Sequence, residues 1–190
     1  NENYKIHVSS VIIPHCFKKG TKILCLNRDN KEEYVSVEDI KKGDLIKTYL
    51  NGFRSIERID KNYIINKPED SKNSMYKILK CDHRFGQVFK NLTLVGDHAV
   101  LVEKITDEQT QKEKSYYGNV FELDGKICNH SFLHEKFQKV TEKRIYECYQ
   151  IILQYDDNDK KEFGIWANGL LIKLSYPSGN SIYDEEYKKQ

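Results

Sequence analysis

The stretch His15-Cys16-Phe17-Lys18-Lys19-Gly20-Thr21 leads from an apolar segment, residues 11–14, into a second apolar run, residues 22–26. The run 22–26 has the composition of a strand, and the Lys-Gly-Thr before it has that of a turn. Cys16 therefore places a nucleophilic thiol at the entry to a strand, beside the peptide bond that joins it to His15. A small apolar core residue fits the same place, so the rest of the chain has to decide between the two interpretations.

Composition sets the broad class of the protein. The chain has 190 residues, 38% hydrophobic and 32% charged, which is enough for one sizeable core with a polar surface. Its 31 basic and 29 acidic residues leave a net charge of +2. That balance provides no electrostatic attraction to nucleic acid or to a membrane surface, and no apolar run approaches the roughly 20 residues of a membrane span. We expect neither kind of partner.

The cysteines indicate the compartment. There are five, scattered and without a C-x-x-C pair, which argues against a disulfide framework and for a reducing, intracellular setting. The first residue is Asn rather than Met, so we expect a segment of a longer precursor or a processed product.

The pattern of apolar residues predicts a mostly β protein. Many of the 13 Tyr and eight Phe stand beside Ile, Val and Leu, as is typical of strands. Asn51-Gly52 predicts a two-residue hairpin turn between strands at 45–50 and 53–59. Further strands are expected at 74–81, 87–94, 99–103, 144–155 and 163–174. Short helices are expected at 36–41, with Ser36 as N-cap, and at 131–138, and an exposed loop at 104–115.

Four patterns follow one another in a fixed order along the chain. They are Cys16-Phe17-x-x-Gly20-Thr21-Lys22-Ile23; Val37-x-x-Ile40-x-x-Gly43-Asp44-Leu45-Ile46-x-Thr48; Leu92-Thr93-Leu94-Val95-Gly96-Asp97-His98-Ala99-Val100-Leu101-Val102; and Tyr149-Gln150-Ile151-Ile152-Leu153 with Ile165-Trp166-Ala167-Asn168-Gly169-Leu170-Leu171-Ile172. Four ordered blocks are far more specific than a single motif.

These blocks resemble the Hint domain, the self-processing module shared by hedgehog C-terminal domains and inteins. Residues 20–26 and 166–169 look most similar to the Hint domains in proteins of giant DNA viruses. The resemblance covers about residues 16–174 and implies an all-β, pseudo-symmetric, horseshoe-like fold. It divides the chain into an upstream flank resembling an N-extein (1–15), the Hint domain (16–176) and a polar tail (177–190).

The resemblance also implies an autocatalytic, cysteine-dependent self-cleavage without a cofactor or metal. Cys16 would attack the carbonyl of His15 and convert the peptide bond into a thioester. His98 would act as the general acid that protonates the departing amide nitrogen. The substrate would be the chain's own upstream segment, and water or a small nucleophile would accept the acyl group.

Four positions depart from the family pattern. Val95 stands where the family usually has a Thr, and Thr93 shares its strand parity. Gln150 stands where an acid is frequent, with Cys148 two residues before it on the same face. Thr93, Asp97, Cys148 and Gln150 are therefore supporting candidates. Lys173 and Leu174 replace the terminal His-Asn of inteins, so the resemblance implies N-terminal cleavage without C-terminal splicing.

Two other interpretations remain open at this point. The first is a catalytically degenerate Hint domain, retained as a structural or interaction module of a larger assembly such as a virus particle. The second is an unrelated β-rich metal-binding or interaction domain, which only Cys81-Asp82-His83 and Cys128-Asn129-His130 favour. Their spacing is not a usual zinc pattern, and we expect no metal. The acidic run 156–159 lacks the Gly and Glu of a calcium loop and suits a solvated turn.

Overall fold

Residues 15–81, 88–155 and 162–175 are described by a computed structural model of the chain. This part of the chain is all-β, with one α-helix, α1 (Asp107–Tyr117), and one short 3-10 helix, η1 (Val37–Asp39). The strands are β1 (Phe17–Lys18), β2 (Lys22–Leu26), β3 (Glu32–Ser36), β4 (Leu45–Lys47), β5 (Phe53–Ile65), β6 (Met75–Ile78), β7 (Leu92–Val95), β8 (Ala99–Val102), β9 (Glu122–Leu123), β10 (Lys126–His130), β11 (Gln138–Lys139), β12 (Ile145–Leu153), β13 (Phe163–Ala167) and β14 (Leu170–Leu174).

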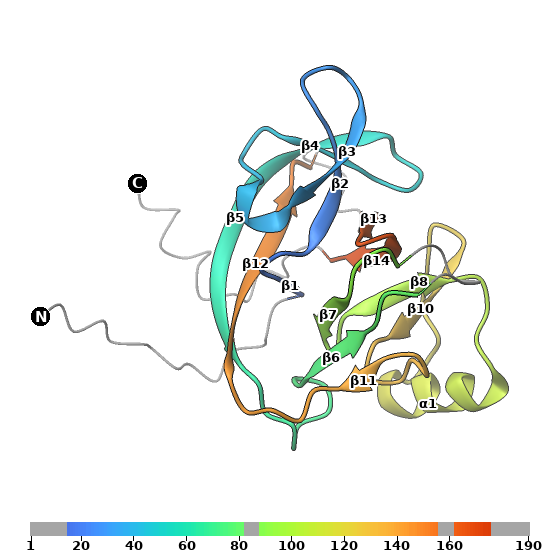
Figure 1. The fold of residues 1–190 in the computed structure, drawn as a ribbon. Helices are drawn as coiled ribbons and strands as arrows, with labels where there is room; N and C mark the ends of the chain where they lie inside the picture. The colour runs from blue at the N-terminus through green and yellow to red at the C-terminus, as the bar shows by residue number, and fades with distance from the viewer. Residues whose placement is uncertain (1–14, 82–87, 156–161, 176–190) are drawn as a thin grey trace, which may run out of the picture.

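The strands pair along one continuous path, in the order β11-β6-β7-β1-β12-β5-β4-β2-β13-β14-β8-β10-β9, with β3 on the side of β2. The long strand β5 joins the two ends of the molecule, because its residues 53–55 pair with β4 and the rest pair with β12. Figure 1 shows β5 and β12 as long curved ribbons side by side, with β2, β3 and β4 at one end and β6, β7 and β11 at the other.

The core lies between these strands and is built from β-branched and aromatic side chains. Its largest cluster includes Phe17, Leu94, Tyr149, Ile165 and Ile172, which come from five different strands. Burying each such side chain stabilises the fold by about 1.5–3 kcal/mol. The short strand β1 is thus held in place by apolar contacts to distant parts of the chain.

Most of the expected strands are present, but residues 163–174 form the antiparallel hairpin of β13 and β14 rather than one strand, and the strand expected at 87–94 begins only at Leu92. The expected hairpin at Asn51-Gly52 has a longer turn. Lys47 pairs with Phe53, so residues 48–52 form the loop. The Thr48 hydroxyl donates a hydrogen bond to the Gly52 carbonyl, and Thr48 also bridges to Ile165. Gly52 has a φ of 66°, whereas Asn51 has no positive φ, so the two-residue turn was a wrong prediction.

Neither of the two expected helices forms as predicted. Residues 36–41 contain only the 3-10 turn η1, and Ser36 ends β3 without making a side-chain cap. Residues 131–138 form successive turns after His130, which accepts backbone hydrogen bonds from Leu133 and His134, and then enter β11. Tertiary contacts at both places outweigh the local preference for helix.

The segment expected to be an exposed loop, 104–115, contains most of α1 instead. Thr106 and Gln109 form a reciprocal capping box at its N-terminus, and Gly118 ends it in the left-handed conformation. The helix is polar on most of its surface, so no apolar stripe signals it in the sequence. Within the described part of the chain, no helix has the length and apolar character needed to span a bilayer.

Candidate active site

Cys16 directly precedes β1, between β7 and β12. Phe17 pairs with Leu94 on one side and with Tyr149 on the other. Both pairings are antiparallel, so one further step of the register places Val95 and Gln150 on either side of Cys16. Two of the positions that depart from the Hint pattern, Val95 and Gln150, therefore flank the predicted nucleophile.

The Cys16 thiol lies in a small buried cluster. Cys16 is fully buried and packs in one group with Val95, Met75 and Cys148. The amide Nδ2 of Asn62, on β5, donates to its Sγ over 3.7 Å. Burial raises the pKa of the Cys16 thiol well above its ordinary value, and nearby Cys148 adds to this, while the Asn62 hydrogen bond opposes it. The thiol is therefore neutral at pH 7 and needs a base to react.

His98 lies at the tight turn between β7 and β8. In this turn a Cβ on Gly96 would come within 2.3 Å of the Ser71 carbonyl oxygen, so only glycine fits. The Gly96 amide donates to the Ser74 carbonyl at 2.7 Å, and the Asp97 amide donates to the Lys72 carbonyl at 2.8 Å. The turn is fixed by its backbone, which gives the two side chains that follow Gly96 defined directions.

The His98 ring contacts both neighbours of Cys16. It stacks on His15, with ring centroids 5.0 Å apart and planes at 17°, and it lies 5.1 Å from the Phe17 ring. Its Nε2 is 2.9 Å from the Lys173 carbonyl oxygen, which can only accept, so Nε2 carries the proton. The ring thus lies against the side chains of the two residues that flank Cys16.

The other ring nitrogen of His98 is unused. Nδ1 is buried and has no hydrogen-bond partner among the described residues. Burial, with a further effect of nearby His15, lowers the pKa of His98 well below its ordinary value. His98 is therefore a neutral imidazole with a free lone pair on Nδ1, which is the state that can accept a proton.

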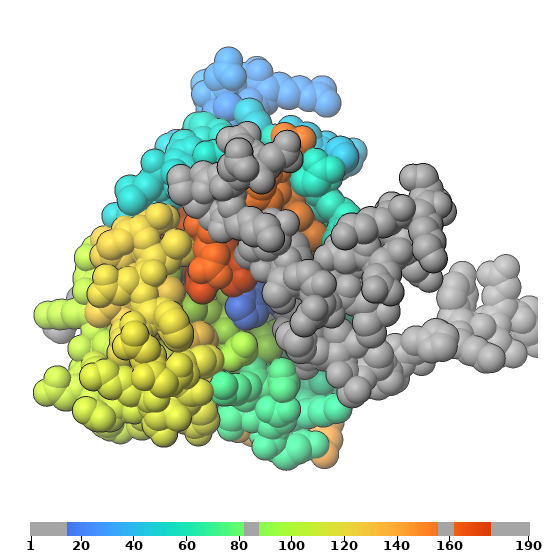
Figure 2. Space-filling view, turned by 180° about the vertical axis from the view of Figure 1, so that it is seen from behind, coloured from blue at the N-terminus to red at the C-terminus, as the bar shows by residue number. Residues whose placement is uncertain are grey.

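His15 is itself held in this site. Its Nδ1 is 2.7 Å from the Ser175 hydroxyl, and its Nε2 is 3.6 Å from the Asp97 carboxylate. Seen from behind (Figure 2), the start of the described chain, in dark blue, comes to the surface next to the C-terminal strands, in red-orange. Both ends of the described chain therefore meet at the predicted site.

The structure brings together most of the residues that the sequence singled out. Cys16, His98, the His15 carbonyl position, Asp97 and Cys148 all lie at this site, and Gln150 lies beside Cys16 by register. Thr93 has the predicted parity, but the register places it opposite Lys18 rather than Cys16. Its hydroxyl therefore does not stand in the place of the one that Val95 lacks.

Sequence reasoning missed four polar residues around Cys16 and His15. Asn62 and Asp60 lie on the second half of β5, which was expected to end at 59, and Asp60 pairs with Gln150. Tyr117 belongs to the helix that was expected to be a loop. Ser175 follows the last strand. Long-range strand pairing and the placement of α1 bring these residues close, so no local pattern could reveal them.

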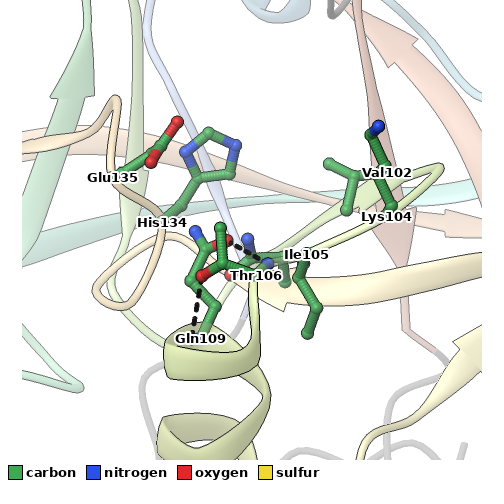
Figure 3. Close-up of a pocket in the computed structure, with 8 residues that line it drawn as sticks. Val102, Lys104, Ile105, Thr106, Gln109, His134 and Glu135 are labelled. Atoms are coloured by element: carbon green, nitrogen blue, oxygen red, sulfur yellow. Dashed lines mark hydrogen bonds between the residues drawn. The ribbon is translucent and has the colours of Figure 1, made fainter.

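A separate pocket lies at the N-terminus of α1 (Figure 3). It has a volume of about 310 Å³ and is lined by Val102, Lys104, Ile105, Thr106, Gln109, Asn129, His134 and Glu135. Figure 3 shows the Thr106–Gln109 capping box at its floor. None of these residues belongs to the Cys16–His98 site.

The described residues contain no cluster of three or more His, Cys, Asp or Glu side chains placed to hold a metal ion. The Cys128-Asn129-His130 pair lies on β10, where His130 Nδ1 is 2.8 Å from the Glu113 carboxylate. Asp82 and His83 of the other pair, and the acidic run 156–159, lie outside the described residues.

No protein-family model matches this chain, and no curated protein has a sequence that matches it. The geometry of the site therefore carries the functional argument.

Proposed function

We propose that this chain is a Hint-type self-processing domain that cleaves its own His15–Cys16 peptide bond through an N–S acyl shift, without C-terminal splicing. The all-β architecture is compatible with that fold. The observation that carries the proposal is the position of His98, whose ring lies against both His15 and Phe17 while its Nδ1 stays unused.

The proposed reaction moves one proton and exchanges one bond. The neutral His98 takes the Cys16 thiol proton, directly or through a water molecule, and Sγ attacks the His15 carbonyl carbon. The C–N bond breaks, and the buried imidazolium, which is a strong acid because of its lowered pKa, protonates the departing amide nitrogen. A thioester and a free amine result. Water or an added thiol then releases the upstream segment.

Val95 and Lys173 set the expected rate and outcome. A valine in place of a positioned hydroxyl removes one hydrogen-bond donor, a loss that typically slows a reaction by about 100–1,000-fold. We therefore expect cleavage over hours, accelerated by thiols. The Lys173 carbonyl accepts from His98, and the Lys173 ammonium pairs with the Glu162 carboxylate at 2.8 Å. Because Lys173 and Leu174 occupy the positions where inteins have His-Asn, no Asn is present there to cyclise.

The proposal is tested by expressing residues 1–190 with an upstream tag and incubating the purified chain with and without dithiothreitol. The proposal predicts a thiol-accelerated loss of the tag in the parent and in the control Cys81→Ala, whose cysteine is exposed. Cys16→Ala and His98→Ala should abolish it. Equal tag loss in Cys16→Ala, or a full-length chain under every condition, would reject self-cleavage.

A second candidate function rests on the burial of Cys16. Its fully buried thiol, its raised pKa and the flanking Val95 and Gln150 also suit a degenerate Hint-type domain that serves as a structural or interaction module. A full-length parent chain that unfolds cooperatively would favour this second function over the first.

A further inference from the structure

The side chain of His15 is held from three sides. Ser175 approaches one ring nitrogen at 2.7 Å, Asp97 approaches the other at 3.6 Å, and His98 covers one face of the ring. We infer that Asp97 and Ser175 make the site specific for an imidazole side chain directly before the nucleophile, with Asp97 as the specificity-determining residue. This inference rests on the proposed self-cleavage and names the substrate that it accepts.

The chemistry of the two partners matches an imidazole. A neutral imidazole offers one N–H donor and one acceptor nitrogen on opposite edges of its ring. The Asp97 carboxylate, which can only accept, faces Nε2 at 3.6 Å, and the Ser175 hydroxyl, which can donate, lies 2.7 Å from Nδ1. An alkyl side chain would leave the Ser175 hydroxyl and Asp97 Oδ2 without their contacts to residue 15, and an amide side chain would reach only one of them.

Asp97 is itself anchored by the helix that the sequence did not reveal. The Tyr117 hydroxyl, near the end of α1, donates to Asp97 Oδ1, while Oδ2 faces His15. Tyr117 stacks on His130 with centroids 3.9 Å apart and planes at 18°. Two rigid contacts thus orient the carboxylate before it meets His15, which is what selectivity requires.

The electrostatics of Asp97 support the same assignment. Burial acts to raise the pKa of its carboxyl group, but the His15 imidazole and the Tyr117 hydroxyl outweigh burial and hold the pKa below its ordinary value. Asp97 is therefore an anion at neutral pH, a state in which its oxygens can only accept hydrogen bonds.

The contact between His15 and Asp97 matters more for the position of His15 than for the stability of the fold. The His15 and Asp97 side chains are 24% and 38% exposed, and polar pairs with this much exposure stabilise a fold only weakly. The His15 carbonyl carbon, however, is the atom that Cys16 must attack. A displacement of about 1 Å at such an atom can slow a reaction about 100-fold. The contact should therefore affect cleavage far more than stability.

The first part of the test measures cleavage. In the tagged chain, His15→Ala and Asp97→Asn should each slow thiol-induced cleavage at least tenfold, whereas Asp29→Asn, on the β2–β3 turn, should change it less than twofold. The double variant His15→Ala/Asp97→Asn should be no slower than the single ones, because both remove the same contact. His15→Gln, which keeps one N–H donor for Asp97, should recover part of the rate.

The second part uses Cys16→Ala, which cannot cleave and so reports the contact alone. The NMR signals of the His15 ring should shift on Asp97→Asn and on Tyr117→Phe, but not on Asp29→Asn. Unchanged ring signals, or Asp97→Asn cleavage at the parent's rate, would overturn the inference. If the parent never cleaves, the proposed function fails and the cleavage specificity fails with it, while shifted ring signals would still show that Asp97 holds His15.

Discussion

At the scale of single residues, the site combines a thiol that stays protonated with a histidine whose Nδ1 has no hydrogen-bond partner among the described residues. Burial keeps the proton on Cys16, and burial also keeps His98 neutral with its Nδ1 open. At rest, Cys16 and His98 are therefore both neutral and do not form a thiolate–imidazolium pair. In this account the reaction depends on transient transfer of the thiol proton to His98 rather than on a preformed thiolate.

The burial of the cysteines predicts their reactivity. Cys81 is the exposed cysteine, whereas Cys16, Cys25, Cys128 and Cys148 are buried. Burial raises the pKa of Cys25 and Cys148 to about 12 and that of Cys128 to about 11. With a disulfide reagent at pH 8, we expect one fast thiol per folded chain and loss of this phase in Cys81→Ser. A second fast thiol, or a fast phase retained in Cys81→Ser, would contradict the burial of Cys16.

Much of the site could be predicted at this scale, and the reason for the remainder is physical. Cys16 and His98 stand in ordered sequence blocks, so the pattern identified them. Asn62, Tyr117 and Ser175 reach the site only through strand pairing and helix placement over 46, 20 and 160 positions of chain. Contacts of that kind leave no local signal in a single sequence.

At the scale of elements, α1 and the β7–β8 turn form one supporting unit. The Glu113 carboxylate, on α1, accepts hydrogen bonds from the backbone N–H of His130 at 2.8 Å and from its ring at 2.8 Å. The amide of Ser131, the next residue, donates to the His98 carbonyl at 3.0 Å. The helix is therefore attached to the turn that carries His98 through polar contacts rather than an apolar stripe.

This attachment predicts a large difference between two glutamates of the same helix. Glu113→Ala removes a carboxylate that is 1% exposed and leaves buried donors of His130 unpaired, which should destabilise the fold by about 3 kcal/mol. Glu108→Ala, at a site 77% exposed, removes only a surface pair with Lys112 and should leave the free energy of unfolding almost unchanged. Urea unfolding of both variants in the Cys16→Ala background measures this. Equal effects would mean that α1 is not held by Glu113.

The elements also show where sequence patterns succeed and fail. Strands such as β12 and β14 were predicted because Ile, Leu and Tyr dominate them. The helix α1 was not, because its sequence is charged and its main signal, the Thr106–Gln109 capping box, is short. The turn at 48–52 was predicted wrongly because the Thr48 hydroxyl donates a hydrogen bond to the Gly52 carbonyl. This contact outweighs the preference of Asn-Gly for a two-residue turn.

At the scale of the whole molecule, buried histidines link folding to pH. Burial lowers the pKa of His98 and of His134, whereas both return to about 6.5 when the chain unfolds. Below about pH 6.5 the unfolded chain therefore binds protons that the folded chain does not. Stability should fall with decreasing pH, by up to about 1.4 kcal/mol per pH unit for each histidine.

This effect is measured by urea unfolding of Cys16→Ala at pH 7, 6 and 5. We expect the free energy of unfolding to decrease over this window and the decrease to be smaller in His134→Gln. Four carboxyl groups of the described residues have a lowered pKa and lose their contribution only below about pH 4, so they do not disturb the window: Glu57, Asp97, Glu108 and Glu147. A free energy that stays constant from pH 7 to 5 would mean that neither histidine is buried as a neutral group.

The all-β class was predictable for the whole molecule, because aromatic and β-branched residues recur along most of the chain. The meeting of both ends of the described chain at one site was not predictable from composition or from any single block. It depends on β1 entering between β7 and β12, and on the Lys173 carbonyl reaching His98.

The most direct test of the central claim is the mass of the upstream fragment released from the tagged chain in dithiothreitol. Self-cleavage at Cys16 predicts a fragment that ends at His15 and carries one dithiothreitol as a thioester, heavier than the free acid by one dithiothreitol minus one water. The reason is that the thiol exchanges with the thioester on the His15 carbonyl. In hydroxylamine the same fragment should carry a hydroxamate, and Cys16→Ala should yield neither. A fragment that ends elsewhere, or a spectrum with only the intact chain, would contradict the claim that Cys16 attacks the bond before it.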